Sequence, residues 1–481
     1  MSGGGRQLKN ACIYLAPPLI GNALSLLSLM VLARYVSTAD FGAWALAQAY
    51  AFFVVGIANV GLNIGYERNF FEHSSPGGSA GLLYSTLALV LGILVVFGAA
   101  TMICGPAIAA VITGMPRDAN LIFWAYCAAA VASLKAYYLI YLKNIEDAKS
   151  FAWYTIDENI LGTAFALALV AYFQVGIIGL VWGQLFAGVL VLAVLVVKAA
   201  GSMPVRFDAP ALWACLRISL PLTPRILFGA IGSHFDKYML RLLDSIGGAG
   251  IYSIGQRISN VVFVFMTAIQ NVYSPQVYKK MFGLGPEAGS AIGTYLTPFL
   301  YASVASGLLM ALFAEEVVTV LMPASYLDAI DVIMIMSMLY VSYFFGKQPH
   351  LTFAKKAWLT SALTLFGIVL NVAINVPLIR SWGALGAAWG TFVAGMITSA
   401  VTFFVSQRYC NIQWEYAKIL PMLALFFASV IALILMRRYE LPYTVRLPVK
   451  LAVIAGFAYA GFSSGVLRRG GIASLLSAFQ R

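Results

Sequence analysis

The chain is a succession of long apolar runs separated by short polar connections. Fourteen runs of roughly 20 residues recur from end to end, and each is long enough to cross about 30 Å of hydrocarbon as a helix. We place them at roughly 11–32, 41–64, 80–104, 119–142, 151–173, 176–199, 215–240, 247–272, 289–313, 328–346, 357–379, 383–405, 417–436 and 447–467. The pattern predicts an all-α polytopic membrane protein with about 14 transmembrane helices.

Composition supports this interpretation. The 481 residues are 61% hydrophobic and only 10% charged, whereas soluble domains are about 45–50% apolar and 25% charged. The net charge of +12 does not indicate a nucleic-acid partner, because the basic residues fall in the short connections. More than twice as many lie on the side shared with the N-terminus as on the other side. By the positive-inside rule both termini are expected in the cytoplasm. The five cysteines have no metal-ligand spacing, so we expect no metal and no cofactor.

The chain also repeats itself. The segment that begins at Gly176 and includes Trp182 returns 207 residues later, beginning at Gly383 and including Trp389. At nearly the same offset, Pro17 matches Pro224, and further matches join Arg34 to Arg241 and Gly42 to Gly250. Two parallel repeats of six spans each are predicted, a design typical of transporters with a site between the halves. The expected organisation is a first lobe at 1–200, a cytoplasmic linker at 201–214, a second lobe at 215–405, and two extra helices with a basic tail at 406–481.

Three basic residues lie deep within predicted spans, where an uncompensated charge is costly. Arg225 and Arg257 fall near the middle of spans seven and eight, and Lys135 lies in the inner third of span four. We interpret them as lining a cavity for an anion such as pyrophosphate, since Arg offers a two-pronged donor and Lys a point charge. The alternative is that each is neutralised by a nearby acid or extends to a membrane interface.

Acids and prolines within the spans supply further candidates. Asp157 and Glu158 are candidates for Na⁺ or proton coupling, and the alternative is an ion pair with Lys135 or Lys149. Pro17 and Pro224 hold equivalent places in the two repeats and are candidate hinges, unless they are only packing kinks. Among the remaining polar residues, His234 is interpreted as a hydrogen-bonded structural histidine, and Glu315, Glu316 and Asp331 as solvated residues near the outer face.

Four stretches carry a resemblance to a known family. They are Leu32-Ala-Arg34-Tyr-Val-Ser-Thr-Ala-Asp40-Phe41-Gly42-Ala-Trp44, its mate from Leu240-Arg241 through Gly250-Ile-Tyr252, Leu220-Pro221-Leu-Thr-Pro224, and Asn371-Val-Ala-Ile-Asn375-Val-Pro377 through Trp382-Gly383-Ala-Leu-Gly386. With them the chain resembles the Wzx-type polysaccharide or O-antigen flippases of the multidrug/oligosaccharidyl-lipid/polysaccharide exporter superfamily. The resemblance implies two V-shaped six-helix lobes around a central cavity, two extra helices and alternating access.

The resemblance also implies a substrate and a place. The expected cargo is an undecaprenyl-pyrophosphate-linked oligosaccharide, flipped across the bacterial cytoplasmic membrane for O-antigen, capsule or exopolysaccharide synthesis. Membrane lipids, and a polymerase and a chain-length regulator of the same pathway, are the expected partners. A lipid II flippase and a multidrug extruder share the same superfamily, and the excess of buried cations argues against an extruder of cationic drugs. A membrane glycan polymerase or ligase needs a large outer loop, which the sequence lacks, so no enzyme activity is expected.

Overall fold

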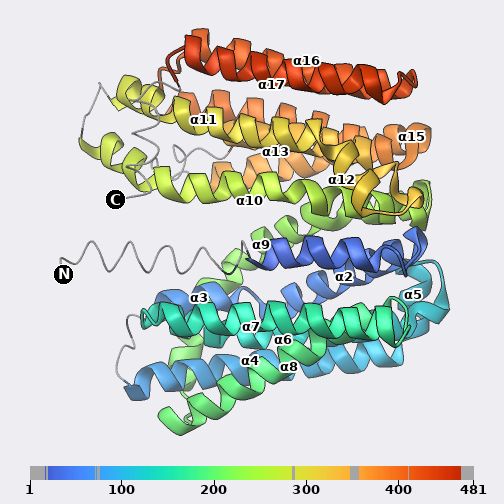
Figure 1. Ribbon diagram of the computed structural model, residues 1–481. Helices are drawn as coiled ribbons and strands as arrows, with labels where there is room; N and C mark the ends of the chain where they lie inside the picture. The colour runs from blue at the N-terminus through green and yellow to red at the C-terminus, as the bar shows by residue number, and fades with distance from the viewer. Residues whose placement is uncertain are drawn as a thin grey trace. The chain divides into compact units, whose positions relative to one another are not determined.

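The computed structural model describes residue 17, residues 20–70, residue 72, and residues 76–283, 288–346, 357–409 and 411–466. Throughout these ranges the chain is helical and contains no strand. Figure 1 shows long helices lying side by side within each half of the chain. The predicted all-α polytopic fold is confirmed.

The chain divides into two compact units, Met1–Ser253 and Ile254–Arg481. Besides a short apolar helix at Ile20–Leu32, the first unit contains a series of labelled helices. They are α2 (Thr38–Asn59), α3 (Leu62–Asn69), α4 (Pro76–Ile103), α5 (Gly105–Ile112), α6 (Ala119–Asn144), α7 (Ala148–Leu167), α8 (Ile178–Ser202), α9 (Ala209–Leu243) and the start of α10 (Ile246–Gly283).

The second unit contains the rest of α10 and six further helices. They are α11 (Ala288–Leu312), α12 (Ala314–Leu321), α13 (Ala329–Gly346), α15 (Ala357–Gln407), α16 (Tyr416–Arg438) and α17 (Tyr443–Ser463). Two predicted spans, 357–379 and 383–405, form the single long element α15. Gly383 interrupts this helix with φ 53° and ψ −129°, a conformation that glycine adopts at little cost because it has no Cβ.

Within the described residues, each of the fourteen predicted runs overlaps a helix or half of α15. Within the described ranges, nine helices are long and apolar enough to cross a membrane. Large exposed aromatic side chains lie near the helix ends of the first unit, with Trp153 and Trp213 at the starts of α7 and α9 and Tyr172 beyond the end of α7. Exposed aromatics at helix ends are typical of the membrane interface. The number of fourteen crossings stays a prediction.

The duplication is visible in the order of the short elements. Helices α5 and α12 begin 209 residues apart, at Gly105 and Ala314, and both have eight residues. A three-residue 3₁₀ turn follows each, at Pro116–Asp118 and Ala324–Tyr326. Gly176 and Gly383, 207 residues apart, both have positive φ. The two halves of the sequence therefore repeat the same local structure.

The boundary between compact units differs from the predicted lobe boundary. The first half of α9 follows the short connection Met203–Asp208, which lies inside the predicted linker, yet α9 packs against α2, α3 and α4. Asp208 caps α9 by accepting a hydrogen bond from the amide of Ala211 at 3.0 Å. The predicted lobes were defined by sequence duplication, whereas the two units are defined by compactness. The lobes 1–200 and 215–405 therefore stay a prediction.

Within the first unit, two repeat-related glycines bring α2 and the start of α10 into backbone contact. A Cβ atom at Gly42 would overlap the carbonyl oxygen of Ile246, and one at Gly250 would overlap the carbonyl oxygen of Thr38. Ile246 and Thr38 are themselves repeat mates, 208 residues apart. The contact is therefore reciprocal, as at an interface between two copies related by a two-fold axis.

Candidate functional site

The candidate site in the first unit is an ion pair between α6 and α7. The ammonium of Lys135 donates to a carboxylate oxygen of Glu158, and the side chains are only 9% and 21% exposed. Helix α8 closes the site, because Gly188 lies close enough that a Cβ there would be 3.7 Å from the Glu158 carboxylate. The absence of a side chain at Gly188 thus leaves room for the acid between three helices.

A polar network connects α6 to α2 through Ser133 and Tyr137, which are two residues before and after Lys135. The Tyr137 hydroxyl donates to Oδ1 of Asn59 at 2.8 Å, and Nδ2 of Asn59 donates to the Ser133 hydroxyl at 2.6 Å. Nδ2 also donates to the carbonyl of Val55 at 3.1 Å. Buried polar groups of this kind are stable only when they are hydrogen-bonded, and this network satisfies the end of α2 beside the ion pair.

The pair has a direct electrostatic consequence. Lys135 and Glu158 neutralise each other, so Lys135 does not present an unbalanced positive charge in this structure. The structure brings together two residues to which separate roles were assigned from the sequence, and it matches the ion pair that was considered as the alternative. A phosphate group can take Lys135 as a ligand only by replacing Glu158.

The neighbouring acid is arranged differently. Asp157 is half-buried on α7 and makes no hydrogen bond or ion pair with any residue that the structure describes. The predicted alternative partner Lys149 is exposed at the start of the same helix. The two adjacent carboxylates therefore occupy distinct surroundings, and only Glu158 is held by a cation.

The other predicted site residues are distributed over both units. Arg257 is half-buried on α10 in the second unit, and it interacts with another part of the chain. Pro17 is helical and buried. The backbones of Pro224 and Arg225 belong to α9, but their side chains lie outside the described part of the structure. The pyrophosphate, coupling and hinge roles of these residues stay predictions.

The prediction that Glu315 and Glu316 are solvated was wrong. Both acids lie in the first turn of α12 and bind Lys450 of α17, at 3.1 Å and 2.7 Å. The Lys450 side chain is 0% exposed, and Arg446, one turn earlier, contacts Glu315 at 3.0 Å. Burial raises the pKa of Glu316, but hydrogen bonds from Lys450 and from the Tyr443 hydroxyl outweigh it, and the pKa lies below its usual value.

Asp331 is likewise not solvated. It begins α13 and pairs with Arg437 at the end of α16, at 3.0 Å. The last two helices are thus fastened to the second repeat by ion pairs with α12 and α13. Sequence reasoning missed these pairs because the partners are more than 100 residues apart, although the cluster of basic residues at 437–450 was a signal.

His234 also differs from its interpretation as a hydrogen-bonded histidine. Its ring lies 5.0 Å from that of Phe52. Its Nδ1 atom is buried and has no hydrogen-bond partner among the described residues. Two residues further along α9, Asp236 is buried and accepts a hydrogen bond from Tyr252 at 2.9 Å. The buried polar contact at this end of α9 is therefore made by the acid.

The fold defined by these helices is that of membrane transporters. The chain is similar to "Lipid II flippase MurJ, inward closed conformation", with a TM-score of 0.73 and 12% identity over 95% of this chain and 100% of that one. It is also similar to an inward-facing multidrug resistance MATE family transporter of the MOP superfamily, with a TM-score of 0.62 and 16% identity over 83% of this chain and 97% of that one. At these identities the likeness concerns the fold alone.

Sequence comparison identifies the family. Residues 7–279, more than half of the chain, match the family described as "Polysaccharide biosynthesis protein", and the chain belongs to that family. It is also 21% identical over 199 residues to the "Probable low-salt glycan biosynthesis flippase Agl15" of Haloferax volcanii. That match covers 40% of this chain and 42% of the relative. The relatives are thus flippases and transporters of polysaccharide biosynthesis and the MOP superfamily, in agreement with the resemblance seen in the sequence.

Proposed function

We propose that this protein flips an undecaprenyl-pyrophosphate-linked oligosaccharide from the inner to the outer leaflet of the bacterial cytoplasmic membrane. The observation that carries the proposal is the family match over residues 7–279 on a chain with a transporter fold. The printed function of the partial relative, a glycan biosynthesis flippase, supports the same substrate class. The cargo then serves surface polysaccharide synthesis, and a polymerase and a chain-length regulator act on it afterwards.

The Lys135–Glu158 pair suggests how transport is coupled to an ion. If pyrophosphate takes Lys135 as a ligand, Glu158 loses its partner and becomes an isolated buried carboxylate. Leaving one partner of a buried pair uncompensated costs about 3–5 kcal/mol. Uptake of a proton or Na⁺ by Glu158 removes that cost, so substrate binding and cation binding favour each other. In this scheme Glu158 is the coupling residue and Lys135 the phosphate ligand.

Arg225 and Arg257 extend the same proposal. They supply further donors for the pyrophosphate, and Pro17 and Pro224 allow the two repeats to bend during alternating access. The charge distribution supports an orientation with both termini in the cytoplasm. The exposed Arg206 lies in the connection between α8 and α9, on the predicted side of the membrane that carries most of the basic residues.

Reconstitution tests the function directly. Purified protein in vesicles is given a fluorescent undecaprenyl-pyrophosphate oligosaccharide, lipid II or a cationic drug, and the fraction of each that reaches the opposite leaflet is measured with an impermeant quencher. We expect protein-dependent movement of the oligosaccharide lipid above that of the other two. Movement of the drug alone, or equal movement with and without protein, contradicts the proposal. If lipid II moves fastest, the assigned substrate changes to lipid II, the substrate named for the structurally similar flippase.

Imposed gradients test the coupling. An inward or outward gradient of H⁺ or Na⁺ is expected to change the initial rate of the wild type. The same gradient is expected to have no effect on Glu158→Gln, which cannot ionise. Asp157→Asn serves as the matched control, because it neutralises the adjacent acid, which has no cation partner among the described residues, without changing its size. Equal gradient responses in the wild type and Glu158→Gln remove Glu158 from the coupling step.

A further inference from the structure

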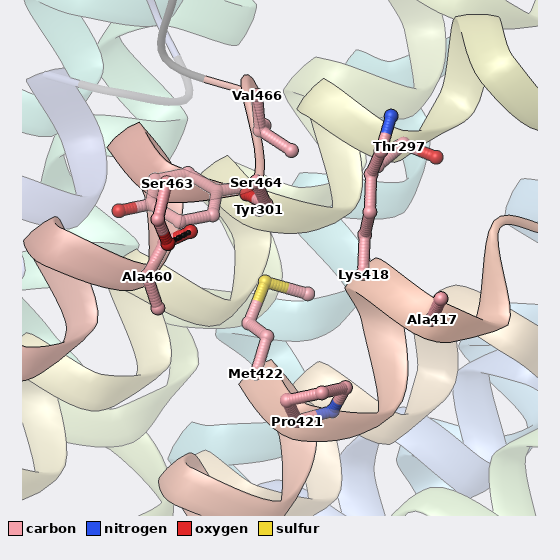
Figure 2. A pocket seen from close by; sticks show the side chains of 10 residues that line it. All are labelled: Thr297, Tyr301, Ala417, Lys418, Pro421, Met422, Ala460, Ser463, Ser464 and Val466. Carbon is pink, nitrogen blue, oxygen red and sulfur yellow. Dashed lines mark hydrogen bonds between the residues drawn. The ribbon is translucent and has the colours of Figure 1, made fainter.

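A cavity lies in the second unit, far along the chain from the Lys135–Glu158 pair. It has a volume of about 240 Å³ and is formed by α11, the start of α16 and the end of α17. One water needs roughly 10–15 Å³ on this measure, so the cavity has room for a group of several heavy atoms. Figure 2 shows Lys418 on one side and Tyr301 with the serines of α17 on the other.

Glycines of α11 explain how the cavity forms. Cβ atoms at Gly289 and Gly293 would overlap the carbonyl oxygens of Asn411 and Gln413, so the segment before α16 lies directly on the α11 backbone. The amide of Gln413 donates to the carbonyl of Gly289 at 3.1 Å. This register brings Lys418, the third residue of α16, to the level of Thr297 and Tyr301.

The cavity lies at a membrane interface. It is bounded by the first residues of α16 and the last residues of α17, both of which are helices able to cross a membrane. Tyr416, next to the cavity, is a half-exposed aromatic residue of the kind that is enriched at interfaces. Lipid headgroups occupy the depth at which membrane-crossing helices begin and end.

The polar lining presents one cation and several hydrogen-bond acceptors. Lys418 supplies the cation. It also pairs with Glu415 at 2.6 Å, which is not part of the lining, so a phosphate in the cavity shares the ammonium with that carboxylate. The four hydroxyl groups of the lining already donate their protons to backbone carbonyls. They belong to Thr297, Tyr301, Ser463 and Ser464. Their oxygens therefore have only lone pairs to offer to a ligand.

Pro421 removes a backbone donor from the same wall. Proline has no N–H, so it cannot donate the helical hydrogen bond to the carbonyl of Ala417, four residues earlier. Both residues line the cavity. A backbone carbonyl without a donor is costly in a membrane, where no water replaces the lost bond. A ligand that carries N–H groups would satisfy this carbonyl and the hydroxyl oxygens together.

We propose that this cavity binds the phosphoethanolamine headgroup of a membrane lipid, with the phosphate on Lys418 and the ammonium directed to the acceptors. An anionic lipid without an amine matches only the lysine. A choline headgroup has the same charges as ethanolamine, but its nitrogen carries three methyl groups and no N–H. The site is separate from the proposed transport site and does not depend on the proposed function.

Native mass spectrometry of the full-length protein tests the assignment. The protein is titrated with phosphatidylethanolamine, phosphatidylcholine and phosphatidylglycerol of identical acyl chains, and the fraction of each that stays bound is compared. We expect the ethanolamine lipid to be retained about fivefold to tenfold more than the choline lipid, since one hydrogen bond contributes on the order of a factor of five. Equal retention of these two lipids, or preferred retention of phosphatidylglycerol, overturns the proposal.

Variants locate the lipid in this cavity. Pro421→Ala supplies the missing N–H without adding bulk, and the preference for ethanolamine over choline is expected to fall about fivefold. Lys418→Gln is expected to weaken both lipids equally. Lys143→Gln is the matched control, because Lys143 also pairs with a glutamate, Glu67, at 2.7 Å on an exposed surface. An unchanged preference in Pro421→Ala, or equal losses in Lys143→Gln and Lys418→Gln, places the lipid elsewhere and refutes the site.

Discussion

Separating Lys135 from Glu158 is the most informative perturbation, because the pair can act in stability, in transport or in both. Its side chains are 9% and 21% exposed, so removing one partner leaves the other charge poorly solvated. We expect Lys135→Met and Glu158→Leu each to reduce the free energy of unfolding by about 3 kcal/mol. This is the lower end of the range of about 3–5 kcal/mol for breaking buried pairs, because a fifth of Glu158 reaches solvent.

The double variant Lys135→Met with Glu158→Leu separates the stability contributed by the ion pair from that of each side chain alone. Replacing both charges by apolar residues of similar size is often neutral or stabilising. We therefore expect the double variant to be more stable than either single variant. The two single losses sum to about 6 kcal/mol and the double loss is below about 3 kcal/mol, so the coupling energy exceeds about 3 kcal/mol. Denaturant unfolding of the detergent-solubilised protein measures all four states of this cycle.

The exchanged variant Lys135→Glu with Glu158→Lys then distinguishes stability from transport. It retains an ion pair, so stability is expected to recover in large part, but the cation now projects from α7 and the acid from α6. Transport of the lipid-linked oligosaccharide is expected to stay below a tenth of the wild-type rate. Wild-type transport by the exchanged variant refutes the reasoning, because the pair would then act only in packing. Additive effects in the double variant refute the electrostatic account of its stability.

Three further predictions concern other parts of the chain. A cysteine at Arg206 is expected to be protected from impermeant reagents in intact cells and one at Arg117 to be labelled; the reverse pattern inverts the proposed topology. Gly42→Val is expected to separate α2 from the start of α10, since a side chain there overlaps the carbonyl of Ile246; spin labels near this contact should then report a longer distance, and an unchanged distance rules out the contact. The folded pKa of Glu316 is lowered from the ordinary glutamate value of 4.5. Its ionised form is therefore expected to contribute stability above pH about 4.5, and this contribution is lost as the pH falls through the folded pKa. Glu316→Gln should flatten this part of the pH–stability curve, and an identical curve for the variant excludes the contribution.

Much of the architecture followed from the sequence alone. The length of the apolar runs fixes helices in a membrane, because only internally hydrogen-bonded backbone is stable there. The repeated Gly and Trp segments predicted a duplication, and the paired short helices α5 and α12 show it. Ser37 and Asp208 cap the starts of α2 and α9 by accepting hydrogen bonds from the backbone amides three residues further on.

The partners of the charged residues were decided only by tertiary structure. The sequence showed that Lys135 and Glu158 were costly to bury, but it left more than one partner or role open for each. Glu158 is 23 residues from Lys135, and Glu316 is 134 residues from Lys450. Which of these charges meet depends on how the helices pack and rotate about their axes, and apolar surfaces specify that rotation through many weak contacts spread along the chain. The sequence therefore determined that the buried charges needed compensation, and the packing of the helices determined which residue compensates each one.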